Sequence, residues 1–175
     1  VNTSLTYTVT GADANGCENI DDVYIEAYPL PNVIAGQEQF VCIGEQVTLF
    51  ASGASNYVWD NGVSDGVAFI PAATSTYNVI GTDVNSCENT DQTSVTVYEL
   101  PEMIETVIHE NYGNDGAVSI DVISGGSPYL FDWDIDGFGD NDDEQDLTEL
   151  TGGTYTVVVT DSYDCSDTLT VIVES

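Results

Sequence analysis

Three stretches of the chain share one pattern of apolar and polar positions. In each, apolar residues alternate with polar ones, a turn rich in Asp, Asn and Gly follows, and the turn ends at a cysteine; the stretches are residues 5–17, 76–87 and 154–165. A second alternating segment follows each cysteine, as at Val95 and Val97. Alternation with a period of two is typical of half-buried β-strands, and two such strands around a short turn form a hairpin. The pattern therefore predicts a β-hairpin that recurs along the chain.

The recurrence has a nearly fixed period. Cys87 follows Cys17 by 87 − 17 = 70 residues, and Leu100-Pro101 follows Leu30-Pro31 by the same distance. Proline stiffens a connection and cannot donate to a β-ladder, so the two Leu-Pro pairs mark boundaries between repeats. The period predicts an all-β chain of stacked units, in which each hairpin closes a small sandwich. Residues 1–30 hold only a hairpin, which is marginal alone, so we expect an excerpt of a longer chain or completion by a neighbouring chain.

Alternating apolar positions also predict the strands inside the two longer segments. They are Val47 and Leu49, Tyr57 and Trp59, then Val67 and Phe69 in the first, and Val118, Ile120 and Val122, then Tyr129, Phe131 and Trp133 in the second. We interpret Trp59 as a core residue packed between two sheets, since sandwich strands commonly carry one. In the alternative interpretation, Trp59, Trp133 or surface tyrosines are platforms that stack on sugar rings.

Motifs that carry a family resemblance cover nearly the whole chain. The first set is Val41-Cys42-x-Gly44, Ala51-Ser52-Gly53-Ala54, Tyr57-x-Trp59-x-x-Gly62-Val63, Phe69-x-Pro71 and Tyr77 to Cys87. It resembles the immunoglobulin-like repeats of giant secreted proteins of Bacteroidota. The second set is Asn114-Asp115-Gly116, Ser124-Gly125-Gly126-Ser127-Pro128-Tyr129, Gly152-Gly153-Thr154-Tyr155 and Cys165, and it looks like the SprB-type repeat of gliding adhesins. The chain departs from that repeat at residues 109–112, where an early cysteine is often found.

The resemblance implies tandem immunoglobulin-like β-sandwich repeats in an elongated array. Residues 1–30 would be the C-terminal hairpin of an incomplete immunoglobulin-like repeat, 31–100 a complete one, and 101–175 a SprB-type sandwich with an acidic loop. It also implies export by type IX secretion and display on the bacterial cell surface, as a structural or adhesive segment of a giant filament or adhesin. Its uses would be attachment, gliding or cell–cell contact. The expected partners are neighbouring repeats, identical chains in a homo-oligomeric filament, and surface glycans; a carbohydrate-binding module of a secreted protein is the alternative function.

The amino-acid composition indicates the environment in which the protein works and the partners that it does not bind. The chain has 175 residues, no Lys or Arg, 31 Asp and Glu and a formal charge of −31, yet 42% of its residues are hydrophobic, which is enough for a core. Each carboxylate must therefore be solvated, hydrogen-bonded or held by a cation. Salt screens the mutual repulsion, so we expect an extracellular and saline environment. Nucleic-acid binding is disfavoured because no basic side chain can meet a phosphate, and no apolar run is long enough for direct membrane insertion.

Four cysteines, at positions 17, 42, 87 and 165, indicate disulfides in an exported protein. Cys42 precedes the first core strand and Cys87 lies in the last hairpin turn of the same repeat, so both are expected at one end of that sandwich. This placement predicts a Cys42–Cys87 disulfide. Cys17 would pair with a residue upstream, whereas Cys165 would be a buried thiol or a link to another chain. A zinc site is the weaker alternative, since no Cys-x-x-Cys spacing occurs.

An acidic run at residues 132–143 is the candidate metal site. Its spacing fits a calcium loop, with acidic residues at positions 1, 3 and 5, glycine at 6 and a carboxylate at 12. The expected Ca²⁺ ligands are Asp132, Asp134, Asp136, Phe138 (through its backbone carbonyl), Asp140 and Asp143. If Phe131 and Trp133 face the core, Asp132 and Asp134 share the other face of the strand, where they would repel without a cation. The alternative is a solvated acidic hairpin loop.

Catalysis has little support in the sequence, and we expect no enzyme. The chain has no Lys or Arg, its single histidine is His109, and no nucleophile lies beside a base in any motif. The Asp-rich turns before Cys17 and Cys87 are interpreted as plain turns, in which carboxylates cap backbone groups. Two carboxylates facing each other across a cleft would instead favour a hydrolase that cleaves glycosides.

Overall fold

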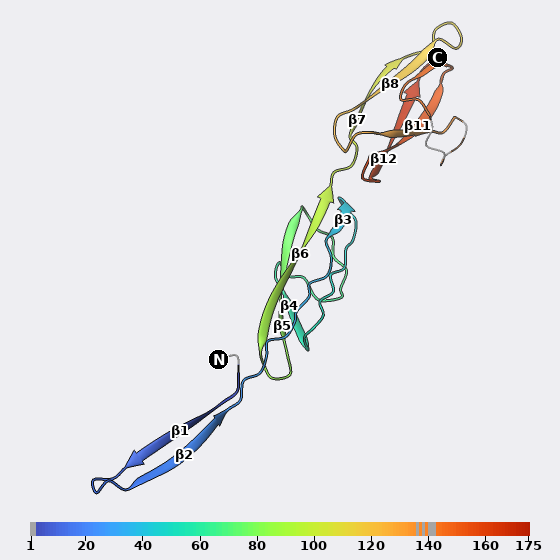
Figure 1. Cartoon of the computed structure of the whole chain (residues 1–175). Helices are drawn as coiled ribbons and strands as arrows, with labels where there is room; N and C mark the ends of the chain where they lie inside the picture. The colour runs from blue at the N-terminus through green and yellow to red at the C-terminus, as the bar shows by residue number, and fades with distance from the viewer. Residues whose placement is uncertain (1–2, 136, 138, 140–142) are drawn as a thin grey trace. The chain divides into compact units, whose positions relative to one another are not determined.

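The computed structural model describes residues 3–135, 137, 139 and 143–175. Within these residues the regular structure consists of β-strands, which confirms the all-β prediction (Figure 1). The strands of the N-terminal half are β1 (Leu5–Ala12), β2 (Glu18–Ile25), β3 (Gln39–Cys42), β4 (Asn56–Trp59), β5 (Ser75–Thr82) and β6 (Glu88–Tyr98). Those of the C-terminal half are β7 (Met103–Ile108), β8 (Gly116–Val122), β9 (Leu130–Trp133), β10 (Leu147–Leu150), β11 (Gly153–Thr160) and β12 (Ser166–Val173).

The three recurrent segments form antiparallel hairpins, as the alternation predicts. β1 pairs with β2 from Leu5↔Ile25 to Ala12↔Glu18, and β11 pairs with β12 from Gly153↔Val173 to Thr160↔Ser166. β5 and β6 are hydrogen-bonded neighbours in a four-stranded sheet of order β3-β6-β5-β4. Each hairpin turns at the Asp-rich segment that precedes its cysteine.

The chain divides into two compact units. Unit 1 consists of Val1–Glu38, Val47–Phe69 and Thr76–Ser94, and unit 2 of Gln39–Gln46, Ile70–Ser75 and Val95–Ser175. This division crosses β5 and β6 and so differs from the predicted repeats, whose boundaries near residues 30 and 100 stay predictions.

Unit 1 holds the β1–β2 hairpin and a small sandwich-like core. β4 pairs antiparallel with β5, from Asn56↔Thr82 to Trp59↔Val79, and two single bridges join Ile34 to Ser52 and Val47 to Phe69. The buried apolar side chains of this unit are Val33, Ala35, Val47, Leu49, Trp59, Tyr77 and Val79. Val47, Leu49 and Trp59 are buried as the alternation predicts, and the prediction that Trp59 is a core residue is confirmed. The predicted strands at residues 47–49 and 67–69 are wrong, because these segments meet only at the Val47–Phe69 bridge, and Val67 is 56% exposed.

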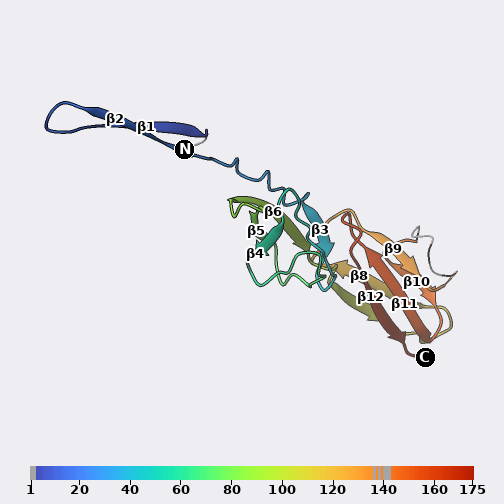
Figure 2. The ribbon, with the colours of Figure 1, turned by 90° about the horizontal axis from the view of Figure 1, so that it is seen from below.

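Unit 2 contains two three-stranded sheets, β10-β8-β7 and β12-β11-β9, visible in Figure 2. Side chains of both sheets form one buried cluster, namely Val118, Ile120, Phe131, Trp133, Leu147, Leu150, Val157, Val159, Val171 and Val173. In the same unit, β3 pairs in parallel with the last four residues of β6, from Gln39↔Val95 to Cys42↔Tyr98. This parallel pairing decides the position of Cys42.

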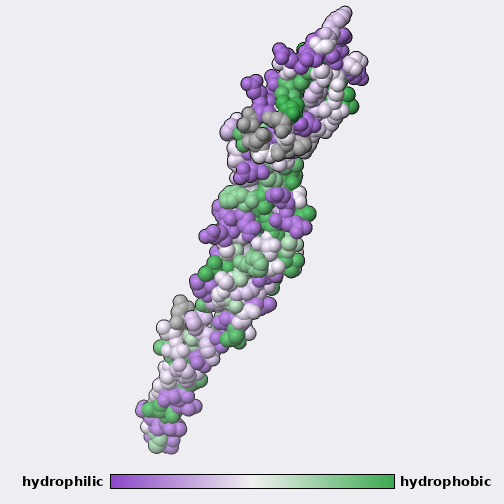
Figure 3. All heavy atoms as spheres, turned by 90° about the vertical axis from the view of Figure 1, so that its right-hand side faces the viewer, coloured by the Kyte–Doolittle hydropathy of each residue, from purple (hydrophilic) through white to green (hydrophobic). Residues whose placement is uncertain are grey.

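Apolar side chains also reach the surface among polar ones, as Figure 3 shows for one face of the molecule. Several of them lie together on the β1–β2 hairpin, among them Val9, Ile20 and Ile25. The described residues contain no helix that is long and apolar enough to cross a membrane.

Substituting Ile120 tests the core of unit 2. Ile120 on β8 is fully buried, whereas Ile172 on β12 is 63% exposed. We expect Ile120→Ala to lower the free energy of unfolding by about 2–5 kcal/mol, because it leaves a cavity, and Ile172→Ala to change it by less than about 0.5 kcal/mol. Denaturant unfolding of both variants measures the difference; equal losses would mean that β8 does not face this core.

Candidate functional site

The three Asp-rich turns have the same hydrogen bonds. In each, one aspartate Oδ1 accepts the backbone N–H groups of the residues two and four positions later. For Asp161 these donors are Tyr163 at 2.8 Å and Cys165 at 3.0 Å. For Asp83 they are Asn85 at 2.8 Å and Cys87 at 2.9 Å. The interpretation of the first two turns, before Cys17 and Cys87, as plain capping turns agrees with this geometry.

The backbone of these turns requires a left-handed residue directly before the cysteine. Gly16, Ser86 and Asp164 occupy that position, with φ of 82°, 63° and 63°. Two accepted N–H groups also stabilise the ionised carboxylate, and those of Cys17 and Asn15 hold the pKa of Asp13 below its usual value. The hydrogen bonds and the left-handed residue therefore fix the position of the cysteine at the end of each turn.

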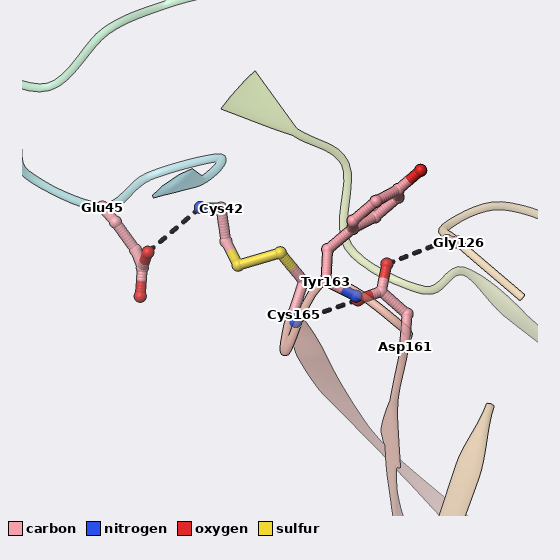
Figure 4. The surroundings of a disulfide bond; sticks show 6 residues. All are labelled: Cys42, Glu45, Gly126, Asp161, Tyr163 and Cys165. Atoms are coloured by element: carbon pink, nitrogen blue, oxygen red, sulfur yellow. Dashed lines mark hydrogen bonds between the residues drawn. A yellow bond between two sulfur atoms is a disulfide. The ribbon is translucent and has the colours of Figure 1, made fainter. Parts of the chain in front are cut away.

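The disulfide of this structure joins Cys42 to Cys165, with 5.6 Å between their Cα atoms (Figure 4). The predicted Cys42–Cys87 pairing is therefore wrong, and Cys87 is a half-buried free thiol. The cause is the parallel pairing of β3, because it places Cys42 opposite Tyr98 at the far end of β6. Cys87 directly precedes β6, so a strand of 11 residues, about 35 Å long, separates the two cysteines.

Several contacts of unit 2 hold the disulfide in place. The rings of Tyr98 and Tyr163 stack with their centroids 3.8 Å apart and their planes 3° apart. The N–H of Cys42 donates to Glu45 Oε2 at 3.0 Å, and Cys165 is fully buried. Asp161 Oδ2 accepts the N–H of Gly126 at 2.9 Å, which ties the turn to the loop before β9 (Figure 4). The stack was missed at the sequence level, although Tyr163 stands where the other two turns carry asparagine.

The acidic run lies partly outside the described residues, namely at positions 136, 138 and 140–142, which include the expected ligands Asp136, Phe138 and Asp140. Among the expected ligands that are described, Asp134 Oδ1 accepts the N–H of Thr156 at 3.0 Å and Asp143 Oδ2 accepts that of Trp133 at 2.6 Å. The described residues contain no cluster of three side chains suited to a metal ion. Calcium binding at this run stays a prediction.

Asp132 stands apart from the other acidic residues of the run. It is only 4% exposed, and its Oδ2 accepts the N–H of Gly139 at 2.7 Å. Its Oδ1 is buried and has no hydrogen-bond partner among the described residues. The equally buried Asp161 accepts three backbone N–H groups, two at Oδ1 and one at Oδ2. An ionised carboxylate buried with one free oxygen is costly unless a positive charge lies beside it.

Other candidate residues of the sequence have structural roles. Trp59 donates its indole N–H to Asp65 and Trp133 donates to the carbonyl of Glu144, and both rings are buried. Neither ring offers the open face that a sugar-stacking platform needs. His109 Nδ1 accepts the N–H of Glu174 at 3.0 Å.

Comparison with known proteins supports the fold alone. No protein-family model and no curated protein matches the chain. Among solved structures, the N-terminal eight immunoglobulin domains of Down Syndrome Cell Adhesion Molecule match with 13% identity and a TM-score of 0.58. The match covers 97% of this chain and 35% of the other, so this chain spans about a third of that length.

Two further structures match at lower scores. An I-band fragment of titin has 11% identity and a TM-score of 0.43, with 98% of this chain and 74% of that chain covered. The insect immune protein hemolin has 10% identity and a TM-score of 0.42, with 97% and 55% covered. Together with the strand topology, the similarity to the adhesion molecule places this chain in the class of all-β proteins with an immunoglobulin-like fold.

Pulling the chain by its two ends tests the disulfide. The two cysteines are 123 positions apart, and the chain between them cannot extend while the bond is intact. Reduction, or a Cys42→Ser substitution, should lengthen the fully extended chain by about 440 Å, at roughly 3.6 Å per residue. Single-molecule force spectroscopy with handles attached at the termini, without thiol chemistry, measures this length.

The control is Cys17→Ser, because Cys17 is an exposed free thiol whose loss should leave the extended length unchanged. A length gain of zero on reduction would show that Cys42 and Cys165 are not bonded in solution.

Proposed function

We propose that the chain is a structural and adhesive segment of a giant surface filament or adhesin, secreted by the type IX route and displayed outside a bacterial cell. It serves attachment, gliding or cell–cell contact as part of an elongated tandem array. The Cys42–Cys165 bond carries this proposal, because it connects a strand of the second sequence repeat covalently to the last hairpin of the third. The immunoglobulin-like fold is the coarser basis of the same proposal.

The disulfide suits a segment that bears load. On the chain-entropy model, closing a loop of 123 residues stabilises the folded state by about 5 kcal/mol. Tension applied to the ends of the chain passes through the bond, so the residues that it encloses do not have to unfold. Disulfides persist in oxidising compartments, which supports a location outside the cytoplasm.

Composition supports exposure to the surroundings of a cell. The chain has no Lys or Arg, so proteases that cleave after basic residues find no site in it. Its charge of −31 favours solubility and opposes close lateral packing at low salt. Identical chains could therefore assemble side by side into a filament only where salt or divalent cations screen the charge. The sequence motifs shared with Bacteroidota repeats supply the bacterial part of the proposal.

Antibodies against the chain test the proposed location and use. They should label intact cells of the source organism as strongly as permeabilised cells, and monovalent antibody fragments should reduce surface attachment severalfold because they cover the array. Fluorescence microscopy and an attachment assay give the two readings. An antibody against a cytoplasmic protein is the control, since it should label permeabilised cells alone.

Labelling that requires permeabilisation would contradict the surface location. Full coverage by antibody fragments without loss of attachment or cell contact would contradict the adhesive role.

Calcium is the cofactor that we propose for the acidic run, and the buried Asp132 is the observation that favours it. Oδ1 of Asp132 has no hydrogen-bond partner among the described residues, and the chain contains no Lys or Arg that could pair with it. A Ca²⁺ ion would supply the charge, with further ligands from the acidic residues that the sequence pattern indicates. The ion would offset part of the negative charge of the acidic run and stiffen its loop.

Thermal unfolding tests the calcium proposal. Millimolar Ca²⁺ should raise the Tm of the full chain by several degrees more than Mg²⁺ at the same ionic strength, because Mg²⁺ demands a tighter octahedral site. Asp132→Asn should abolish the excess. The matched control is Asp121→Asn on β8, an exposed carboxylate whose loss should leave the excess intact. Equal shifts by the two ions in the wild-type chain would indicate charge screening alone.

A further inference from the structure

The site that bonds Cys42 to Cys165 has three parts. The first is the turn that presents Cys165, and the second is Tyr98 at the end of β6, which stacks on Tyr163 of that turn. The third is β3, an edge strand that lies parallel to residues 95–98 and places Cys42 opposite Tyr98. Two of these parts occur earlier in the chain, because the turn has an equivalent 165 − 87 = 78 residues before it and the strand end has one 98 − 28 = 70 residues before it.

The turn occurs again at Cys87 with the same hydrogen bonds. Besides the two contacts of Asp83 Oδ1, the N–H of Asp83 donates to the carbonyl of Cys87 at 3.0 Å, and that of Asp161 donates to Cys165 at 2.9 Å. The N–H of Ser86 donates to Asp83 at 3.1 Å, as Asp164 does to Asp161 at 3.1 Å. Cys87 is therefore held as Cys165 is, but its thiol is free.

The strand end occurs again at Tyr28. Residues 25–28 correspond to residues 95–98 in the repeat, and the hydrogen bonds on one edge agree. The N–H of Ala27 donates to Ser4 Oγ at 3.0 Å, and that of Val97 donates to Thr74 Oγ1 at 2.9 Å. The chain just after Tyr28 lies against the strand that follows the turn of Cys87, because the side-chain amide of Asn89 donates to the carbonyl of Pro31 at 2.9 Å.

The third part, an edge strand like β3, is not found beside residues 25–28 among the described residues. β2 belongs to a two-stranded sheet with β1, and the described residues place no strand along its other edge. The apolar side chains of the hairpin are correspondingly uncovered. Val9 and Ile25 are 65% and 45% exposed, whereas Val79 and Val95, which correspond to them, are fully buried. In the second repeat, the covering is provided by residues 31–70, which include β3.

We propose that Cys87 forms a disulfide with a cysteine on a β3-like strand that lies parallel to residues 25–28, in the register that places Cys42 opposite Tyr98. The occupant is a segment equivalent to residues 31–70 from a further repeat of the same long chain. This inference rests on the proposed function. It adds to that function a disulfide that joins successive repeats. The two thiols lose two protons and two electrons to an external disulfide oxidant, which is reduced to two thiols.

A second copy of this chain is a poorer occupant. Its β3 already pairs with its own β6, and its Cys42 is already bonded to Cys165. A disulfide between the Cys87 residues of two copies would give a dimer without any β3-like strand. The test must therefore distinguish this dimer from the proposed bond.

The test is a longer chain in which a copy of residues 31–70 precedes Val1, so that the copy and residues 1–30 complete one repeat. After folding in a glutathione redox buffer, non-reducing peptide mapping should find the copied cysteine joined to Cys87 and the Cys42–Cys165 bond retained. Labelling of Cys87 by a maleimide should fall more than tenfold relative to the original chain. Amide hydrogen exchange in β1 and β2 should slow, because the copy covers the hairpin.

Two variants of the longer chain serve as controls. Replacing the copied cysteine by serine should leave Cys87 reactive but keep the slow amide exchange, since strand pairing does not need the bond. Replacing Cys87 by serine should leave the copied thiol free.

Three results would overturn the proposal. They are a reactive Cys87 beside a protected hairpin, a hairpin whose exchange is unchanged by the copy, and a Cys87–Cys87 dimer or a bond from the copied cysteine to Cys17. Antibody labelling of cells tests the surface role independently, so a failure of the proposed disulfide is distinguishable from a failure of the proposed function.

Discussion

Carboxylates bound to backbone N–H groups are the interaction on which this structure depends. The chain has 31 acidic residues and no Lys or Arg, so no acidic side chain can pair with either base. Aspartates instead accept hydrogen bonds from the main chain at turns and loop crossings, as Asp91 does from Ala35 and Asp146 from Ile120. The N–H of Ala35 lowers the pKa of Asp91, so this bond holds the loop while keeping the charge. The cysteine turns are the most regular case, and they give the repeat its covalent chemistry.

The sequence predicted the hairpins and much of the core because alternation reports which face of a strand is buried. Tyr77 and Val79 are buried as the pattern indicates, and so are Phe131 and Trp133. Alternation is a local signal, however, and it cannot show which strands lie side by side. No short segment of the sequence indicates that β3 pairs in parallel with β6. This pairing places Cys42 at the end of β6 that is far from Cys87.

The acidic run shows a second limit of local patterns. The calcium-loop spacing indicated Asp132 as a ligand, and alternation put it on the face away from the core. The structure buries Asp132 as well as its two neighbours, and Gly139 donates its N–H to the carboxylate. Because Oδ1 is buried, leaving it without a partner among the described residues costs free energy. The hypothesis of a cation thus gains a physical reason that the spacing alone did not contain.

The disulfide joins β3 to the C-terminal hairpin in a way that does not depend on charge. A bond within one repeat, such as the expected Cys42–Cys87, would leave the Leu100-Pro101 junction as a single peptide connection. The observed bond encloses that junction, so the C-terminal hairpin stays tied to β3 even when the intervening strands separate. Repulsion among the carboxylates grows as salt is diluted, whereas a covalent bond does not depend on ionic strength. Backbone hydrogen bonds fix the geometry of each cysteine turn, and the disulfide keeps the C-terminal hairpin bonded to β3 at any ionic strength.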